Sequence, residues 1–177
     1  MHREYLRDKN KTFEYEGDPL EITSFKIWHC KYRTLNGLEN FKNLKSLVIA
    51  SFPDESLEPL ANLTNLEYLS ILHLPKVTDI EPLSNLKKLE TLSISTLPSW
   101  DASRKTTEVS TLIPLASLPK LKYLELHGIV TPKKKLNDLF SSKSLITAMF
   151  SQYPKAEIER FYKESNVQKQ RIPAASA

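Results

Sequence analysis

Glu125 and His127 are the residues best placed for chemistry, because they lie two positions apart in the run YLELH. On a strand both side chains would point to one face, where a carboxylate can orient an imidazole for acid–base catalysis. Such a pair also needs a nucleophile and an oxyanion donor set, and neither is in register with it. Cys30 follows His29, but a position just after a strand is typical of a buried, inert thiol. We therefore predict no catalytic residues and no enzymatic activity.

Metal and cofactor sites are not expected either. His29 and His73 occupy equivalent places two repeats apart, so strands spaced about 4.8 Å would separate them by about 9.6 Å, too far to share a zinc ion. Only three glycines are present, Gly17, Gly37 and Gly128, and they cannot assemble a glycine-rich phosphate loop. We predict no metal and no cofactor.

The elements that would position these residues come from a repeat. One phrase recurs four times, as LNGLENFKNLKSLVI, LEPLANLTNLEYLSI, IEPLSNLKKLETLSI and LIPLASLPKLKYLEL. In each copy LxxLxI places two apolar residues on one side of a short strand, and LxxLxxL winds a tight turn. Stacked copies bury each other's leucines and align their strands as a parallel sheet on the inner wall of an arc. The copies begin at Leu35, Leu57, Ile80 and Leu112, so the longer last offset predicts an insertion over residues 96–111.

Projecting the period outward predicts a further strand at each end. A step of 22 residues back from the first copy reaches Phe25 and Ile27, and a step of 32 forward from the last reaches Ala156 and Ile158. A helix is expected to begin near Leu136. The fold class is therefore an α/β repeat solenoid, with about six parallel strands on the concave face, helical or 3-10 turns on the convex face and a C-terminal helix.

We expect one domain over residues 1–163. It comprises an N-terminal cap at 1–20, the repeats at 21–130 and a C-terminal capping repeat at 131–163. Residues 164–177 have no core pattern and are predicted to form a flexible tail.

The phrases LEPLANLTNLEYL and IEPLSNLKKLETL resemble the leucine-rich repeats of bacterial internalin-type proteins, over about residues 34–129. The resemblance implies a leucine-rich-repeat solenoid. This chain departs from the pattern where such repeats place an asparagine after the strand, and we expect a different loop path there. Apolar residues and a cysteine take that position: Cys30, Phe52, Leu74, Leu97 and Ile129.

The single cysteine excludes an internal disulfide framework, which agrees with a reducing compartment. The first residues, MHREYLRDKN, are charged where a signal peptide carries an apolar segment, and no stretch approaches the ~20 apolar residues of a membrane span. We expect a cytoplasmic protein without membrane association.

Strand residues between the inward leucines should face solvent on the concave wall, mostly as small hydroxyl side chains. Large side chains on such a background commonly anchor interfaces. In the alternative interpretation the aromatic residues only cover backbone, Trp28 packs under the N-terminal cap, and Trp100 folds back over the core. The predicted partner-binding residues are Trp28, Tyr68, Leu72, Trp100, Tyr123, Glu125 and His127.

The leading hypothesis is a monomeric protein–protein interaction module that binds a protein partner through the concave face and adjacent rim loops. By analogy, a bacterial regulator or a toxin-neutralising immunity protein would fit. The alternative is binding of nucleic acid or an anionic surface through the C-terminal third. Residues 131–177 carry nine Lys or Arg against four Asp or Glu, including Lys133, Lys134 and Lys135. That excess is modest, so no nucleic acid is expected as partner.

Overall fold

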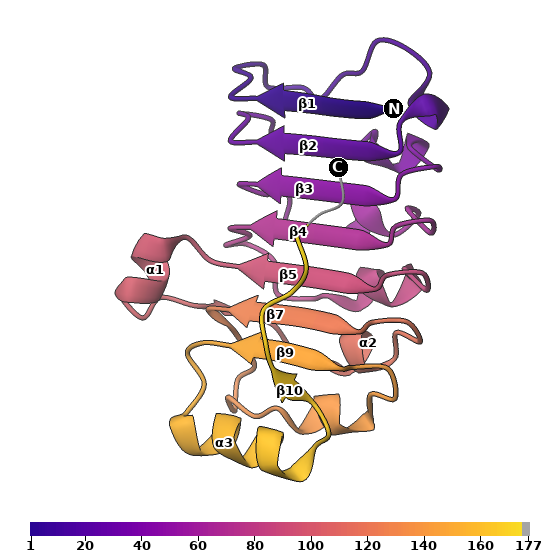
Figure 1. Cartoon of the computed structure of the whole chain (residues 1–177). Coiled ribbons are helices and arrows are strands. Elements are labelled where there is room, and N and C mark those ends of the chain that lie inside the picture. The colour runs from indigo at the N-terminus through magenta and orange to yellow at the C-terminus, as the bar shows by residue number, and fades with distance from the viewer. Residues whose placement is uncertain (175–177) are drawn as a thin grey trace.

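The computed structural model describes residues 1–174, and its main feature is a stack of parallel strands in sequence order (Figure 1). Among these residues, eight strands form the main sheet and β6 pairs with β8 in a second, smaller one. The main sheet contains β1 (His2–Leu6), β2 (Ser24–Trp28), β3 (Ser46–Ala50), β4 (Tyr68–Leu72), β5 (Thr91–Ser95), β7 (Tyr123–His127), β9 (Thr147–Phe150) and β10 (Gln168–Lys169). The smaller sheet contains β6 (Thr107–Glu108) and β8 (Ile129–Val130).

Short helices return the chain behind the sheet from one strand to the next. The LxxLxxL phrase winds as successive 3-10 turns: the amides of Leu60, Leu63 and Leu66 each donate to the carbonyl three residues earlier, at 2.9–3.0 Å. A proline in the first turn favours five of these helices by fixing φ. The helices are η1 (Pro19–Glu21), η2 (Leu38–Asn40), η3 (Glu58–Leu60), η4 (Glu81–Asn85), α1 (Pro98–Ala102), α2 (Ile113–Ala116), η5 (Asn137–Ser141) and α3 (Lys155–Glu164). None of these helices has the length and apolar character needed to span a bilayer.

The core lies between the sheet and the returning turns. In β4, Leu69 and Ile71 are fully buried, whereas Tyr68 and Leu72 are half-buried on the opposite face. The strands are aligned without slip, so Leu69 pairs with leucines of both neighbouring strands. The buried inward residues repeat from β2 to β7, which confirms the predicted solenoid. In β3 and β5 some small outward residues, such as Ala50 and Ser93, are buried as well. We call the outer face of the main sheet the concave face.

The N-terminal cap contributes a strand of its own. β1 pairs in parallel with β2, and the segment after it places Phe13 over the open end of the core. The Phe13 ring lies 5.9 Å from that of Phe25, 5.5 Å from Tyr32 and 6.1 Å from Phe41, measured between centroids. With β1 and β10 added at the two ends, the sheet formed by residues 1–174 has eight strands where the sequence predicts about six.

The predicted last strand is wrong. Ala156 and Ile158 lie in α3, and the strand that follows β7 is β9, which pairs Tyr123 with Thr147 and Leu126 with Phe150. The step is therefore 24 residues, not 32. The preceding repeat is longer only because it contains the insertion. A prediction that repeats its 32-residue offset therefore places the last strand within α3.

The residue directly after several strands has a left-handed backbone conformation. His29, Ser51 and His73 have φ of 52°, 69° and 68°. This turn directs the next side chain into the core, where Phe52, for example, is buried. The equivalent Leu97 is only half-buried, because the insertion begins there.

Candidate functional site

The concave face carries six of the seven predicted site residues. Strand pairing sorts them into three rows that cross the sheet. The first row contains Ser24, Ser46, Tyr68, Thr91 and Tyr123; the second Lys26, Val48, Ser70, Ser93 and Glu125; the third Trp28, Ala50, Leu72, Ser95 and His127. Large side chains thus stand on a floor of small ones, as the sequence predicts.

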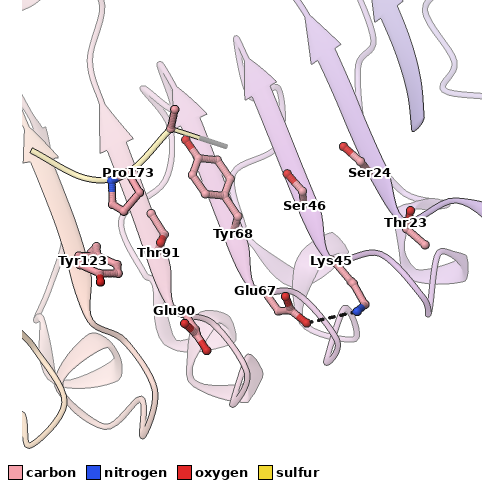
Figure 2. A pocket seen from close by; sticks show the side chains of 11 residues that line it. Thr23, Ser24, Lys45, Ser46, Glu67, Tyr68, Glu90, Thr91, Tyr123 and Pro173 are labelled. Carbon is pink, nitrogen blue, oxygen red and sulfur yellow. Dashed lines mark ion pairs between the residues drawn. The ribbon is translucent and has the colours of Figure 1, made fainter. Parts of the chain in front are cut away.

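Tyr68 and Tyr123 line a hollow on this face. They flank Thr91 in the first row and line a groove of about 420 Å³ near the start of the strands (Figure 2). Burial, followed by the nearby negative charge of Glu125, raises the pKa of Tyr68 above its ordinary value. The groove is therefore a partly desolvated site lined by two phenol rings, and Lys45, Glu67 and Glu90 also contribute to its lining.

The C-terminal segment supplies the remaining wall of this groove. After α3 the chain turns back, and the Gln168 amide donates to the carbonyl of Ile146 at 2.8 Å where β10 joins β9. It then crosses in front of β7 and β5 toward β4 (Figure 1). Pro173 and Ala174 line the groove together with the two tyrosines. A flexible tail was expected from residue 164, whereas the structure gives residues 165–174 defined contacts; residues 175–177 lie outside the described part.

Glu125 holds this crossing segment. Its Oε1 accepts a hydrogen bond from the backbone amide of Ile172 at 3.2 Å, and its Oε2 lies 3.8 Å from Nε2 of His127. The carboxylate therefore serves as an anchor for the chain's own backbone. Among residues 1–174, no three His, Cys, Asp or Glu side chains converge as a metal-ligand set.

Trp28 lies at the N-terminal end of the concave face and not under the cap. It pairs in register with Leu6 of β1, which is 55% exposed. The ammonium of Lys26 lies 5.5 Å from the centre of the Trp28 ring, and Glu4 binds the same ammonium at 3.4 Å. An amphipathic patch of aromatic, aliphatic and charged groups results.

Trp100 is separate from the other predicted residues. It belongs to α1, which projects from the edge where the strands end (Figure 1), here called the rim. Its ring meets His73 edge to face at 4.8 Å between centroids. Asp101 fixes the helix on its other side by accepting from Ser151 at 2.9 Å and from Gln152 at 2.8 Å. The insertion is therefore docked on the rim.

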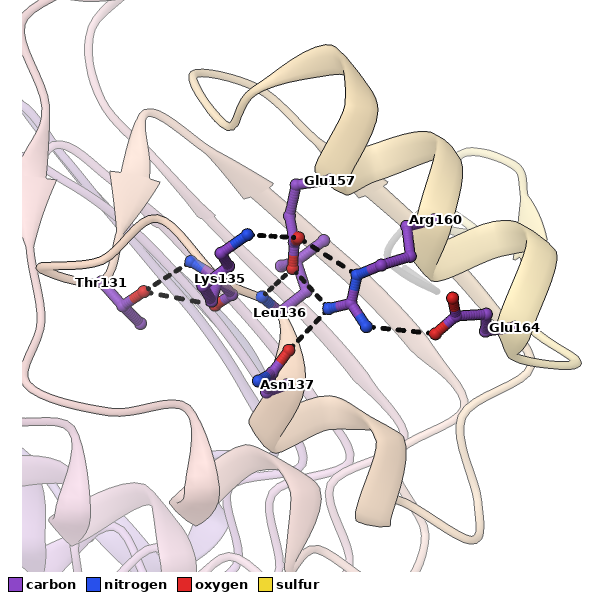
Figure 3. A network of polar contacts seen from close by, with 7 residues as sticks. All are labelled: Thr131, Lys135, Leu136, Asn137, Glu157, Arg160 and Glu164. Carbon is purple, nitrogen blue, oxygen red and sulfur yellow. Dashed lines mark hydrogen bonds and ion pairs between the residues drawn. The ribbon is translucent and has the colours of Figure 1, made fainter.

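A polar network near the C-terminal end escaped the sequence interpretation (Figure 3). The Glu157 side chain is 2% exposed and accepts from Lys135 at 3.2 Å, from Arg160 at 2.8 Å and from the Leu136 amide at 2.8 Å. The Arg160 guanidinium is the main cause that lowers the pKa of Glu157 to about 2. With Ala156 and Ile158 predicted to point inward from a strand, Glu157 was expected to face solvent; it lies in α3 instead, with its side chain buried.

The same network weakens the case for anion binding through the C-terminal third. Lys135 and Arg160 are bound to Glu157, Arg160 also pairs with Glu164 at 3.1 Å, and Lys155 lies 3.6 Å from Glu159. Paired cations attract phosphate less than free ones do.

Comparison with known proteins finds no matching family model and no matching curated protein. Among solved structures, the chain is similar to internalin C2 of Listeria monocytogenes, with 28% identity and a TM-score of 0.55 over 73% of this chain. It is also similar to an internalin (inlF) of the same organism, with 16% identity and a TM-score of 0.31 over 85% of this chain and 67% of that one. The match covers 52% of internalin C2, so the chain spans about half the length of that structure.

Proposed function

We propose that this chain, an internalin-like leucine-rich-repeat protein, is a non-enzymatic module that binds a protein partner through its concave face and the adjacent rim. One observation carries the proposal. Trp28, Tyr68 and Tyr123 stand half-buried on a floor of serine, threonine and alanine. Rigid aromatic side chains on a small, polar background are typical of interface anchors.

The dimensions of the face favour a macromolecular partner. The five strands from β2 to β7, at about 4.8 Å spacing, make a wall about 19 Å across, and the large side chains are distributed over this width. Trp28 lies on β2, Leu72 on β4 and His127 on β7. A small metabolite would contact only one of these anchors, whereas a protein surface can contact all of them.

We further propose a cytoplasmic monomer that acts as a regulator or a toxin-neutralising immunity protein. The single cysteine supports the cytoplasmic location, because it agrees with a reducing compartment. Analogy with other small repeat proteins supports the two roles.

The test is capture of partners from a lysate of the source cells by the wild type and by a triple variant, Trp28→Ala, Tyr68→Ala and Tyr123→Ala. The matched control replaces three exposed residues of the convex side, Asn62, Thr64 and Lys87, with alanine. We expect the control to retain the captured protein and the concave variant to lose it. Equal capture by both variants would overturn the proposal.

A further inference from the structure

The segment of residues 165–174 joins the edge of the main sheet as β10 and then crosses the concave face. Two of its amides are bonded to the solenoid, Gln168 to a carbonyl and Ile172 to a carboxylate. Most of its side chains are exposed, and only Ser165, Val167 and Ile172 are half-buried. An extended segment with few buried apolar contacts opens at low free energy, so it can leave without unfolding the repeats.

The surface beneath this segment has the features of a peptide site. Glu125 accepts a backbone N–H, which any residue but proline can donate. Next to it, Pro173 and Ala174 border the same groove as Tyr68, Thr91 and Tyr123, and their own small apolar side chains stay exposed (Figure 2). Together the carboxylate and the tyrosine-walled groove fit an extended chain that crosses the strands and presents a free amide before small apolar residues.

We propose that Glu125, Tyr68 and Tyr123 form a site for an extended peptide segment of this kind, and that the chain's own residues 170–174 occupy it in the unbound protein. The proposal rests on the proposed function, since a protein partner would present the competing segment. A partner must then displace residues 170–174 from the site. The fraction of molecules in which these residues occupy the site lowers the apparent affinity of the protein for its partner.

A full-length variant with the tail released tests the occupancy directly. Gln168→Pro and Ile172→Pro together remove both amide donors and leave the concave face intact. The matched control is Arg171→Pro, because the Arg171 amide has no acceptor within residues 1–174. Hydroxyl-radical footprinting with mass spectrometry reports the solvent accessibility of each aromatic residue.

We expect oxidation of Tyr68 and Tyr123 to rise about threefold or more in the released variant, in proportion to the open fraction of the site. Oxidation of Trp28, which lies on the same face away from the tail, should stay unchanged, as should all three residues in the control. Glu125→Ala removes the carboxylate that accepts from the Ile172 amide, so it should also raise the oxidation of Tyr123. Unchanged oxidation of both tyrosines in both variants would overturn the occupancy without affecting the proposed function.

The competition is tested with the captured partner. The released variant should bind it about tenfold more tightly than the wild type, because no tail has to be displaced. Equal affinity would overturn the competition, whereas failure to capture any partner would count against the proposed function and leave the footprinting result standing.

Discussion

The backbone amide of Ile172 donates a hydrogen bond to the carboxylate of Glu125 on the concave face, 3.2 Å away and 47 residues earlier in the sequence. Hydrogen bonds to a charged acceptor are stronger than neutral ones. Through this contact a residue that the sequence predicts to bind a partner holds the chain's own C-terminal segment.

Glu125→Ala should therefore loosen the tail. We expect the Ile172 amide to exchange with deuterium several times faster, since its acceptor is gone. Gln retains a carbonyl acceptor, so Glu125→Gln should preserve most of the protection. Hydrogen exchange followed by NMR measures both, and equal exchange in wild type and Glu125→Ala would show that the contact does not hold the tail.

Glu157→Gln should destabilise the C-terminal end. The substitution leaves Lys135 and Arg160 without their shared buried carboxylate. Because the two cations left behind are 56% and 35% exposed, solvent compensates part of the loss, and we expect a cost of about 1–2 kcal/mol. Urea denaturation gives the free energy of unfolding, with Glu159→Gln as the control because that side chain is 65% exposed. A loss no larger than in the control would contradict the role of Glu157.

The Glu157 network also predicts a pH dependence. The folded-state pKa is lowered from an ordinary 4.5 to about 2, so the deprotonated carboxylate favours the folded state. Its contribution is fully present above about pH 4.5 and disappears as the pH falls toward 2. The difference in stability between wild type and Glu157→Gln should shrink over this range, and a difference that is constant from pH 6 down to about pH 2 would refute the assignment.

Trp100→Ala should raise the pKa of His73. Burial lowers this pKa below its ordinary value of 6.5, and the Trp100 ring lies against the imidazole. Removing the ring admits water and stabilises the charged form. NMR titration of His73 tests this, with Trp28→Ala as a control that removes a tryptophan elsewhere. An unchanged titration of His73 in Trp100→Ala would mean that other atoms desolvate it.

Gly128→Ala should destabilise the repeats by about 1–3 kcal/mol. Gly128 has φ of 71°, and an added Cβ would collide with the hydroxyl of Thr96. The double variant with Thr96→Ala removes the collision but keeps the backbone strain, so it should recover part of the loss. Thermal unfolding measures the series, and a wild-type midpoint for Gly128→Ala would contradict the close approach.

The repeats and the residues on their concave face can be predicted from the local sequence pattern. Leu69 and Ile71 point inward because apolar residues alternate along a short strand, and this places Tyr68 and Leu72 on the other face. The same logic located Tyr123 and His127. Local pattern therefore predicts most of the concave face.

The parts that the sequence did not predict depend on long-range contacts. The tail is held by the amides of Gln168 and Ile172, and backbone hydrogen bonds leave no periodic signal. Glu157 is buried only because Lys135 and Arg160 meet it from two different elements. The last strand was misplaced because an insertion length was mistaken for a repeat period.

The affinity of the captured partner for purified variants tests the central claim most directly. Each of Trp28, Tyr68 and Tyr123, as an interface anchor, should contribute about 1–2 kcal/mol, so the triple alanine variant should bind about 100-fold more weakly or worse. The convex control with Asn62, Thr64 and Lys87 replaced should bind like the wild type. A concave variant that keeps wild-type affinity while the convex control loses it would contradict the account.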